Sequence, residues 1–188
     1  MPTTTHADPQ EQLADFPPIL TGLCKKVFER LSACDRKAGD KFLSDISKAA
    51  AGEGKDLSRV PWAFLAAELR EMPRRSENLE RHIDEVIADI DSLASGAEHG
   101  SIEHARLDAC DWKIASYIDA CDVDEAARYA AVHASHAFHR GHAEAVATAI
   151  ACAFNAHVRA AVVGFQADSV RLQAQRQAHL LLSQIKAA

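Results

Sequence analysis

Proline is confined to the first part of this chain. All six prolines occur at or before Pro73, and the 115 residues that follow contain only four glycines. Proline removes a backbone hydrogen-bond donor and clashes with the preceding helical turn, so helices can extend through a long proline-free segment. The same segment is rich in alanine, leucine, glutamate, glutamine and arginine, which are good helix formers. The sequence therefore predicts an all-α fold, a single bundle of six to seven helices with a long C-terminal helix.

Apolar residues at spacings of three and four predict where the helices lie. We expect helices at residues 17–35, 40–51, 58–72, 76–95, 101–120, 122–140 and 141–185. Gly39 is expected to end the first helix and Pro73 the third. A last helix of about 44 residues would be about 66 Å long. That length exceeds a compact domain of this size, so we expect a bend or break near Gly164, or an oligomer such as a homodimer that uses the overhang.

The third helix is apolar over most of its circumference, which is typical of a central helix. Residues 1–16 are polar and are predicted to form a flexible arm, with one domain over residues 17–188. The predicted core is mostly aliphatic and is drawn from all parts of that domain: Leu23, Val27, Leu31, Ile46, Trp62, Leu65, Leu69, Ile83, Val86, Ile90, Ile114, Ile118, Val146 and Ile150.

Charge is unevenly distributed along the chain. The net charge is −6 overall, but residues 17–75 carry a net charge of +4 and residues 76–188 carry −7. A basic front and an acidic helical body can indicate a surface for nucleic acid or an acidic partner near the N-terminus. The alternative is that the two halves of opposite sign pack against each other. The sequence alone leaves both interpretations open.

The five cysteines are odd in number and form no CxxC pair. Because each occupies a helix-like apolar position, we expect reduced, buried thiols in a cytoplasmic protein rather than a disulfide framework. The chain does not start with a cationic segment followed by an apolar run, so we expect no signal peptide. The most apolar window, Ala145–Ala156, is too short to span a bilayer, so we expect no membrane association.

The expected helix at 76–95 has a narrow apolar stripe, and charged residues, all acidic except Arg81, cover the rest of its surface. We therefore expect an outer helix that steers a basic protein partner. The candidate contacts are Glu77, Glu80, Asp84, Glu85, Asp89 and Asp91. The sequence contains no G-x-S-x-G elbow and no Gly-rich phosphate loop. The leading hypothesis is a non-catalytic interaction protein that acts as antitoxins, immunity proteins or adaptors do.

A histidine cluster supports an alternative hypothesis. His133, His136, His139 and His142 recur at every third residue, and His157 follows. On a helical projection, His136, His139 and His157 fall on the apolar face, with His142 at its edge. His136, His139 and His142 are the candidate ligands of a metal or cofactor inside the bundle, which would need further ligands from another helix. The sequence does not identify which metal or cofactor.

The basic front supports a second alternative. Its cations lie on the first helix and around the next two: Lys25, Lys26, Arg30, Arg36, Lys37, Lys41, Lys48, Lys55 and Arg59. The segment Asp45-Ile-Ser-Lys-Ala-Ala-Ala-Gly52 is similar to the middle of the helix-turn-helix of TetR-type repressors. That resemblance implies a dimeric DNA-binding regulator with a groove-reading helix. The sequence departs from the family at Glu53-Gly-Lys-Asp56, where a short turn and the recognition helix are expected.

Overall fold

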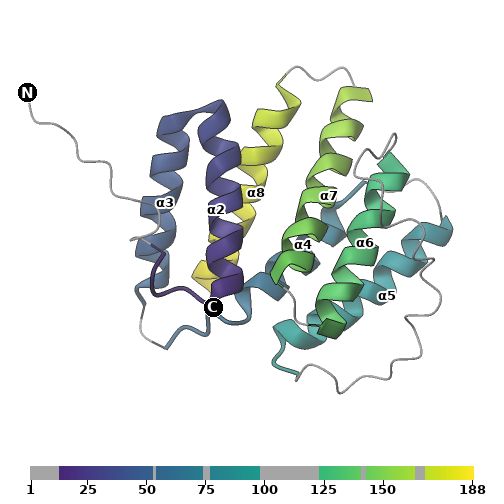
Figure 1. Ribbon diagram of the computed structural model, residues 1–188, viewed down its shortest axis with the longest axis horizontal. Coiled ribbons are helices and arrows are strands. Elements are labelled where there is room, and N and C mark those ends of the chain that lie inside the picture. Colours follow the sequence, from purple (N-terminus) through teal and green to yellow (C-terminus); the bar gives the residue numbers. More distant parts are fainter. Residues whose placement is uncertain (1–12, 53, 74–76, 98–122, 141–142, 164–167) are drawn as a thin grey trace, which may run out of the picture.

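The computed structural model describes residues 13–52, 54–73, 77–97, 123–140, 143–163 and 168–188. Within these ranges every regular element is an α-helix (Figure 1). The helices are α2 (Pro18–Cys34), α3 (Arg36–Ala50), α4 (Val60–Glu71), α5 (Glu77–Ala94), α6 (Val123–Arg140), α7 (Ala143–Val163) and α8 (Ser169–Ala187). The predicted all-α bundle is confirmed. The expected helix at 101–120, with Ile114 and Ile118, lies outside the described residues.

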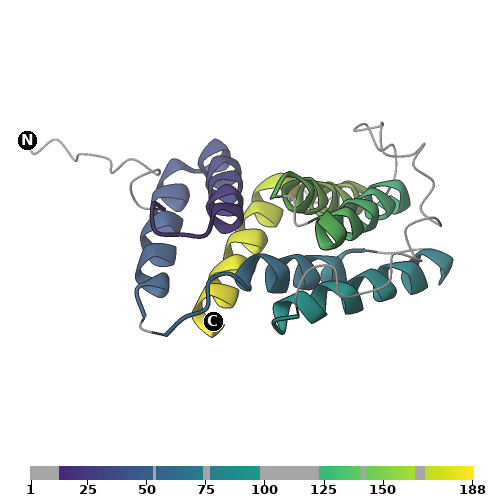
Figure 2. The same ribbon diagram turned by 60° about the horizontal axis from the view of Figure 1, so that its bottom comes forward.

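Two groups of helices are joined through α4. Helices α2, α3 and α8 contact one another, and α6 packs against α7 (Figure 1). Helices α4 and α5 pack side by side, and Figure 2 shows them running along the lower side of the molecule, beneath α6 and α7. Helix α4 contacts α2, α5, α6, α7 and α8. It is therefore the central helix, as its sequence predicts.

The core is continuous across both groups. Helix α4 is buried along its length at Trp62, Phe64, Leu65 and Leu69. Every predicted core residue within the described ranges is buried. Helices α6 and α7 pack against each other, and both contain many alanines that have no exposed surface. Such small side chains let neighbouring helix backbones approach closely. The alanines are Ala126, Ala127, Ala130, Ala131, Ala134, Ala137, Ala149, Ala153 and Ala156.

The boundary between α2 and α3 differs from the prediction at Gly39. The chain turns at Asp35, whose carboxylate accepts hydrogen bonds from the backbone N–H groups of Lys37 (2.9 Å) and Ala38 (3.3 Å) and so caps α3. Helix α3 consequently begins at Arg36 rather than near Asp40. Gly39 lies inside this helix, where a Cβ atom would be 2.0 Å from Ser32 Oγ of α2. Glycine is present there to permit close packing, not to break a helix.

The predicted break in the last helix is confirmed. Helix α7 ends at Val163 and α8 begins at Ser169, and the two helices pack against each other. Lys55, in the loop before α4, fixes the far end of α8 by donating to the backbone carbonyls of Ile185 (2.8 Å) and Lys186 (3.0 Å). A cation at this position also interacts favourably with the helix dipole.

The predicted N-terminal arm extends too far along the chain. Leu13 is 1% exposed and belongs to the hydrophobic core. The Thr21 hydroxyl donates to the carbonyl oxygens of Leu13 (3.3 Å) and Phe16 (3.2 Å). Residues 13–16 are therefore anchored to α2, and Leu13 and Phe16 supply the apolar surface. The boundary was predicted too late in the chain because the residues before Leu13 are mostly polar.

Candidate functional site

The outer face of α5 presents most of the acidic residues predicted to bind a partner. Glu80, Asp84 and Glu85 are exposed, whereas Asp89 and Asp91 are half-buried. Asp91 forms an ion pair with Arg70 of α4, so its charge is already engaged within the molecule. The side chain of Glu77 lies outside the described part of the chain. Glu80, Asp84 and Glu85 are the exposed acids described on this helix, and we call them the α5 acidic face.

A buried stripe holds this helix in place. One side of α5 packs on α4 and α6 through Leu79, Ile83, Val86, Ile87, Ile90 and Leu93, all of which are buried. The helix ends in a Schellman turn, in which Gly96 N–H donates to Leu93 O (3.0 Å) and Ala97 N–H donates to Ser92 O (2.9 Å). Gly96 has a φ of 98°, a conformation that favours glycine. Helix α5, which carries the acidic face, is thus fixed along its buried side and at its C-terminal end.

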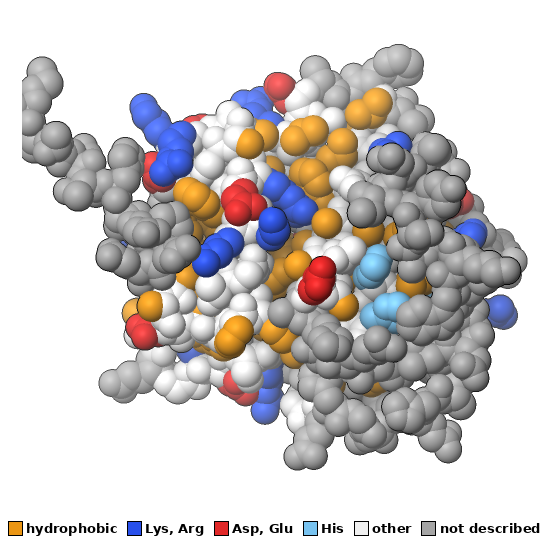
Figure 3. Space-filling view, viewed as in Figure 1, with side chains coloured by type: hydrophobic (Ala, Val, Ile, Leu, Met, Phe, Trp, Pro, Cys, Tyr) orange, Lys and Arg blue, Asp and Glu red, His pale blue; other side chains and the backbone are white. Residues whose placement is uncertain are grey.

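The candidate metal ligands are only partly within the described residues. His136 is half-buried on α6, and its ring meets that of His133 edge-on, with centroids 6.1 Å apart. The side chain of His139 and all of His142 lie outside the described part. Among the residues that are described, no three His, Cys, Asp or Glu side chains are grouped so that they could hold a metal ion. The metal site stays a prediction. Figure 3 shows histidine side chains reaching the surface over α6.

The segment that resembles TetR-type repressors is the end of α3 and the turn after it. The next helix, α4, buries most of its residues in the centre of the bundle. A groove-reading helix needs an exposed face along its length. Several cations of the basic front also have partners within the chain: Arg36 pairs with Asp40 (3.2 Å) and Arg59 with Asp56 (2.7 Å). DNA binding stays a prediction, and α4 does not offer the face that it requires.

A buried polar cluster lies where α2, α4, α7 and α8 meet, and the sequence did not predict it. Glu68 of α4 is completely buried, and its Oε2 accepts a hydrogen bond from Arg176 Nη2 of α8 at 2.7 Å. The same guanidinium donates through Nη1 to Glu71 Oε2 (2.7 Å) and through Nε to Gln173 Oε1 (2.8 Å). Burial raises the pKa of Glu68, and Arg176 acts in the opposite direction.

Arg30 forms the second half of this cluster. Its Nη1 donates to Oε1 of the fully buried Gln177 at 2.6 Å, and its guanidinium lies 4.5 Å from the centre of the Phe154 ring. Burial lowers the pKa of Arg30, and the negative charges of Glu68 and Glu29 oppose this effect. Arg30 therefore faces the junction of the helices and is not part of a free basic surface.

One buried polar atom at the junction, His157 Nε2, has no hydrogen-bond partner among the described residues. Burial, reinforced by the charge of Arg176, lowers the pKa of His157 to about 4, so its imidazole is neutral at pH 7. An unpaired buried polar group costs about 1–3 kcal/mol. The junction is therefore the part of the core in which a substitution should have the largest electrostatic effect.

The two halves of the chain do pack against each other, but not through their net charges. At the junction the front half supplies the acids Glu68 and Glu71, and the back half supplies the cation Arg176. The pair formed by Arg70 and Asp91 has the opposite arrangement. The ion pairs between the halves therefore run in both directions and do not follow the sign of each half's net charge.

Two thiols are poorly suited to nucleophilic chemistry. Burial raises the pKa of Cys24 to about 12 and that of Cys152 to about 11. Both side chains are therefore almost entirely protonated at neutral pH, and because the thiolate is the reactive form they are unreactive. Cys110 and Cys121 lie outside the described residues. Cys34, at the end of α2, is exposed.

Helix α7 also bears on the question of a membrane. By length and composition, its segment Glu144–Val162, with a mean hydropathy of 1.4, could cross a bilayer. The core helix of a soluble protein satisfies the same criterion, and α7 packs against α2, α4, α6 and α8. The expected absence of membrane association therefore stays a prediction.

Comparison with known proteins gives this chain no relatives. No protein-family model, curated protein or solved structure matches it.

Proposed function

We propose that this chain is a non-catalytic interaction protein that binds a basic surface of a protein partner through the α5 acidic face. The observation that carries this proposal is the combination of a firmly packed helix with an acidic outer side. Glu80, Asp84 and Glu85 are exposed on α5, whereas the opposite side of the helix is buried against α4 and α6. Antitoxins, immunity proteins and adaptors present surfaces of this kind.

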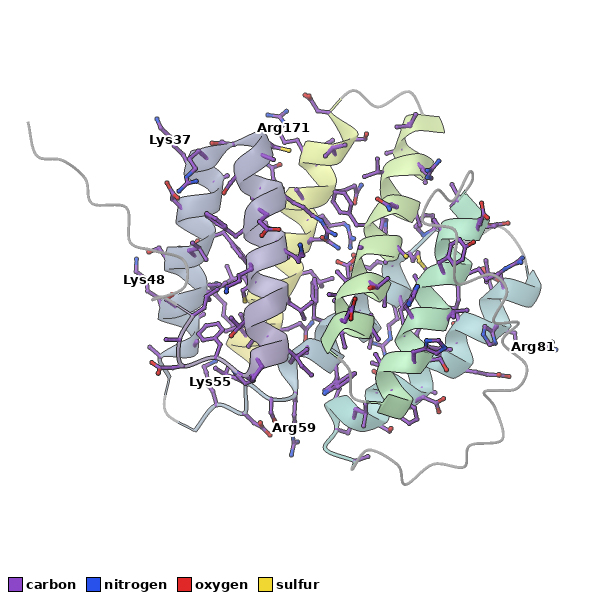
Figure 4. All side chains as sticks on the ribbon, in the orientation of Figure 1. Lys37, Lys48, Lys55, Arg59, Arg81 and Arg171 are labelled. Carbon is purple, nitrogen blue, oxygen red and sulfur yellow. The ribbon has the colours of Figure 1, made fainter. Side chains whose placement is uncertain are left out.

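Electrostatics favours this assignment over a role as a solvated outer helix alone. Glu80 and Asp84 are four residues apart and so lie on the same side of the helix, with Glu85 next to them. Arg81 is exposed beside them, so this face carries three acids and one base (Figure 4). Its net negative charge attracts a basic partner and speeds its association, an effect that salt weakens. The proposal does not depend on bond-breaking chemistry, which agrees with the high thiol pKa values of Cys24 and Cys152.

The test is a triple charge reversal, Glu80→Lys, Asp84→Lys and Glu85→Lys. The purified variant and the wild-type protein are immobilised, and the proteins recovered from the source cell extract are quantified by mass spectrometry. We expect recovery of the specific partner to fall by about tenfold or more, because like charges at an interface suppress binding. A rising salt concentration should also reduce recovery of the partner by the wild-type protein.

A scattered triple reversal is the matched control. Asp15, Glu29 and Glu144 are exposed acids on other parts of the molecule, so replacing them with lysine changes the net charge equally. This variant should recover the partner as the wild type does. Equal recovery by all three proteins, or equal loss in both variants, would count against the α5 acidic face.

A further inference from the structure

A groove lies between α3 and α8, away from the α5 acidic face. Its volume is about 320 Å³, and it is open to solvent. Helix α3 lines it with positions 38, 41, 42 and 45, and α8 lines it with positions 175, 178, 179 and 182. Each set has the spacing i, i+3, i+4 and i+7, so each helix presents one face over two turns. The groove therefore runs between two helix faces for about 10 Å.

The floor of the groove is apolar. Phe42 and Ala178 are buried there, together with Leu31 of α2. Alanine at positions 38 and 178 leaves space that a larger side chain would fill. A recess of this volume falls at the lower end of the range for ligand pockets, and its apolar lining can accept hydrophobic side chains.

The rim of the groove is basic at one end, just beyond the residues that line it. Lys41 pairs with Asp45, the one acid in the lining. Lys41, through its hydrogen bond and charge, and then Lys48 and Lys186 through their charges, lower the pKa of Asp45. Lys48 lies one helical turn beyond Asp45 on α3 and extends outward (Figure 4), and Lys186 lies one turn beyond Leu182 on α8. Both side chains are exposed, so two cations without a place in the lining continue its two helix faces. The rim complements an acidic partner.

We propose that this groove binds an acidic amphipathic helix of a protein partner. A helix laid between α3 and α8 would insert apolar side chains at i, i+3 or i+4, and i+7 onto the Phe42 and Ala178 floor. Its flanking Asp or Glu side chains would face Lys41, Lys48 and Lys186. This site is separate from the proposed α5 surface in both position and charge, so each proposal can fail without the other.

The experiment selects peptides from a displayed library against the full-length protein. The library fixes leucine at i, i+4 and i+7 of a 14-residue helical peptide and randomises the flanking positions. We expect enrichment of peptides with Asp or Glu at the flanks. Chemical-shift perturbation by the most enriched peptide should map to α3 and α8.

Two kinds of variant test the site. Ala38→Leu fills the groove, and the pair Lys48→Glu and Lys186→Glu reverses exposed charges at its rim, so the second variant stays informative if the first folds poorly. We expect each to weaken binding of the enriched peptide by about tenfold, because the added leucine side chain occupies the recess and the two charge reversals replace attraction at the rim with repulsion. Lys26→Glu with Arg128→Glu, both exposed elsewhere, is the matched control and should bind as the wild type does.

Several outcomes would overturn the proposal. These are an absence of enrichment over the starting library, enrichment of basic flanks, and unchanged binding to both groove variants. If the library yields no binding peptide but dodecanoate binds the groove saturably, the proposal is also overturned and the site is assigned to a fatty-acid anion.

Discussion

Arg176 neutralises the completely buried Glu68 through a 2.7 Å hydrogen bond between α8 and α4. Removing one partner of a buried ion pair leaves the other charge without compensation, which is far more costly than the pair itself is stabilising. We therefore expect Arg176→Met to lower the free energy of unfolding by about 3 kcal/mol or more. Urea unfolding followed by circular dichroism measures this change.

The neighbouring Arg171 provides the control. It forms an exposed ion pair with Asp168 at 3.0 Å, and exposed pairs contribute about 0–1 kcal/mol. Arg171→Met should therefore have little effect. Glu68→Gln should cost less than Arg176→Met, because it removes the buried charge and Arg176 keeps Glu71. Equal effects of Arg176→Met and Arg171→Met would show that the buried pair is not intact in solution.

His157 should make the protein sensitive to mild acid. Its pKa falls from 6.5 to about 4 in the folded protein, so the unfolded chain binds more protons between these values. Stability contributed by the neutral imidazole is present above about pH 6.5 and is lost as the pH falls to about 4. The loss amounts to about 3 kcal/mol, since each pKa unit is worth about 1.4 kcal/mol.

His157→Leu should flatten this dependence, as measured by urea unfolding at a series of pH values from 7 to 4. His179, an exposed histidine on α8, supplies the control, and His179→Leu should keep the wild-type profile. If His157→Leu retains the full acid sensitivity, other carboxylates and histidines are responsible for it.

The apolar pattern predicted most of the fold. The spacing of Ile83, Val86 and Ile90 defines the buried side of α5, and the many apolar residues of α4 predict its central position; both predictions are confirmed. Helix boundaries were predicted less well where one residue has two roles. Gly39 can end a helix or allow one to pack closely, and only the position of Ser32 on α2 distinguishes these roles.

The buried polar cluster was not predicted because its members are far apart in sequence. Arg30 and Gln177 are 147 residues apart, and Glu68 and Arg176 are 108 apart. Periodicity describes one helix at a time and does not indicate which helices meet. One signal was present: Glu68 is an acidic residue within a helix that is apolar over most of its circumference. A helix predicted to be central requires a partner for any charge that it buries.

The cysteines should differ in how fast an alkylating reagent modifies them. Cys34 is exposed, whereas burial raises the pKa of Cys24 to about 12 and that of Cys152 to about 11. At pH 8 in the native state, iodoacetamide should therefore modify Cys34 well before the other two, because alkylation requires an accessible thiolate. Peptide mass spectrometry over a time course measures each site. Rapid native-state modification of Cys24 would contradict the packing of α2, and denaturant should make the three react alike.

The contact between Gly39 and Ser32 makes the last prediction. In an isolated helix, Gly→Ala is stabilising by about 1 kcal/mol. Here the new Cβ atom would be 2.0 Å from Ser32 Oγ and 3.2 Å from both Ser32 Cβ and Phe28 Cε2, so α2 and α3 must separate or the serine must rotate. We expect Gly39→Ala to destabilise the protein by about 1 kcal/mol, as overpacking does. Adding Ser32→Ala removes the closest clash and should recover most of that loss in thermal unfolding.

Gly22, exposed on α2 with nothing within 4 Å of a Cβ atom, is the control, and Gly22→Ala should stabilise the protein. A stabilising Gly39→Ala would mean that α2 and α3 pack less closely than this geometry requires.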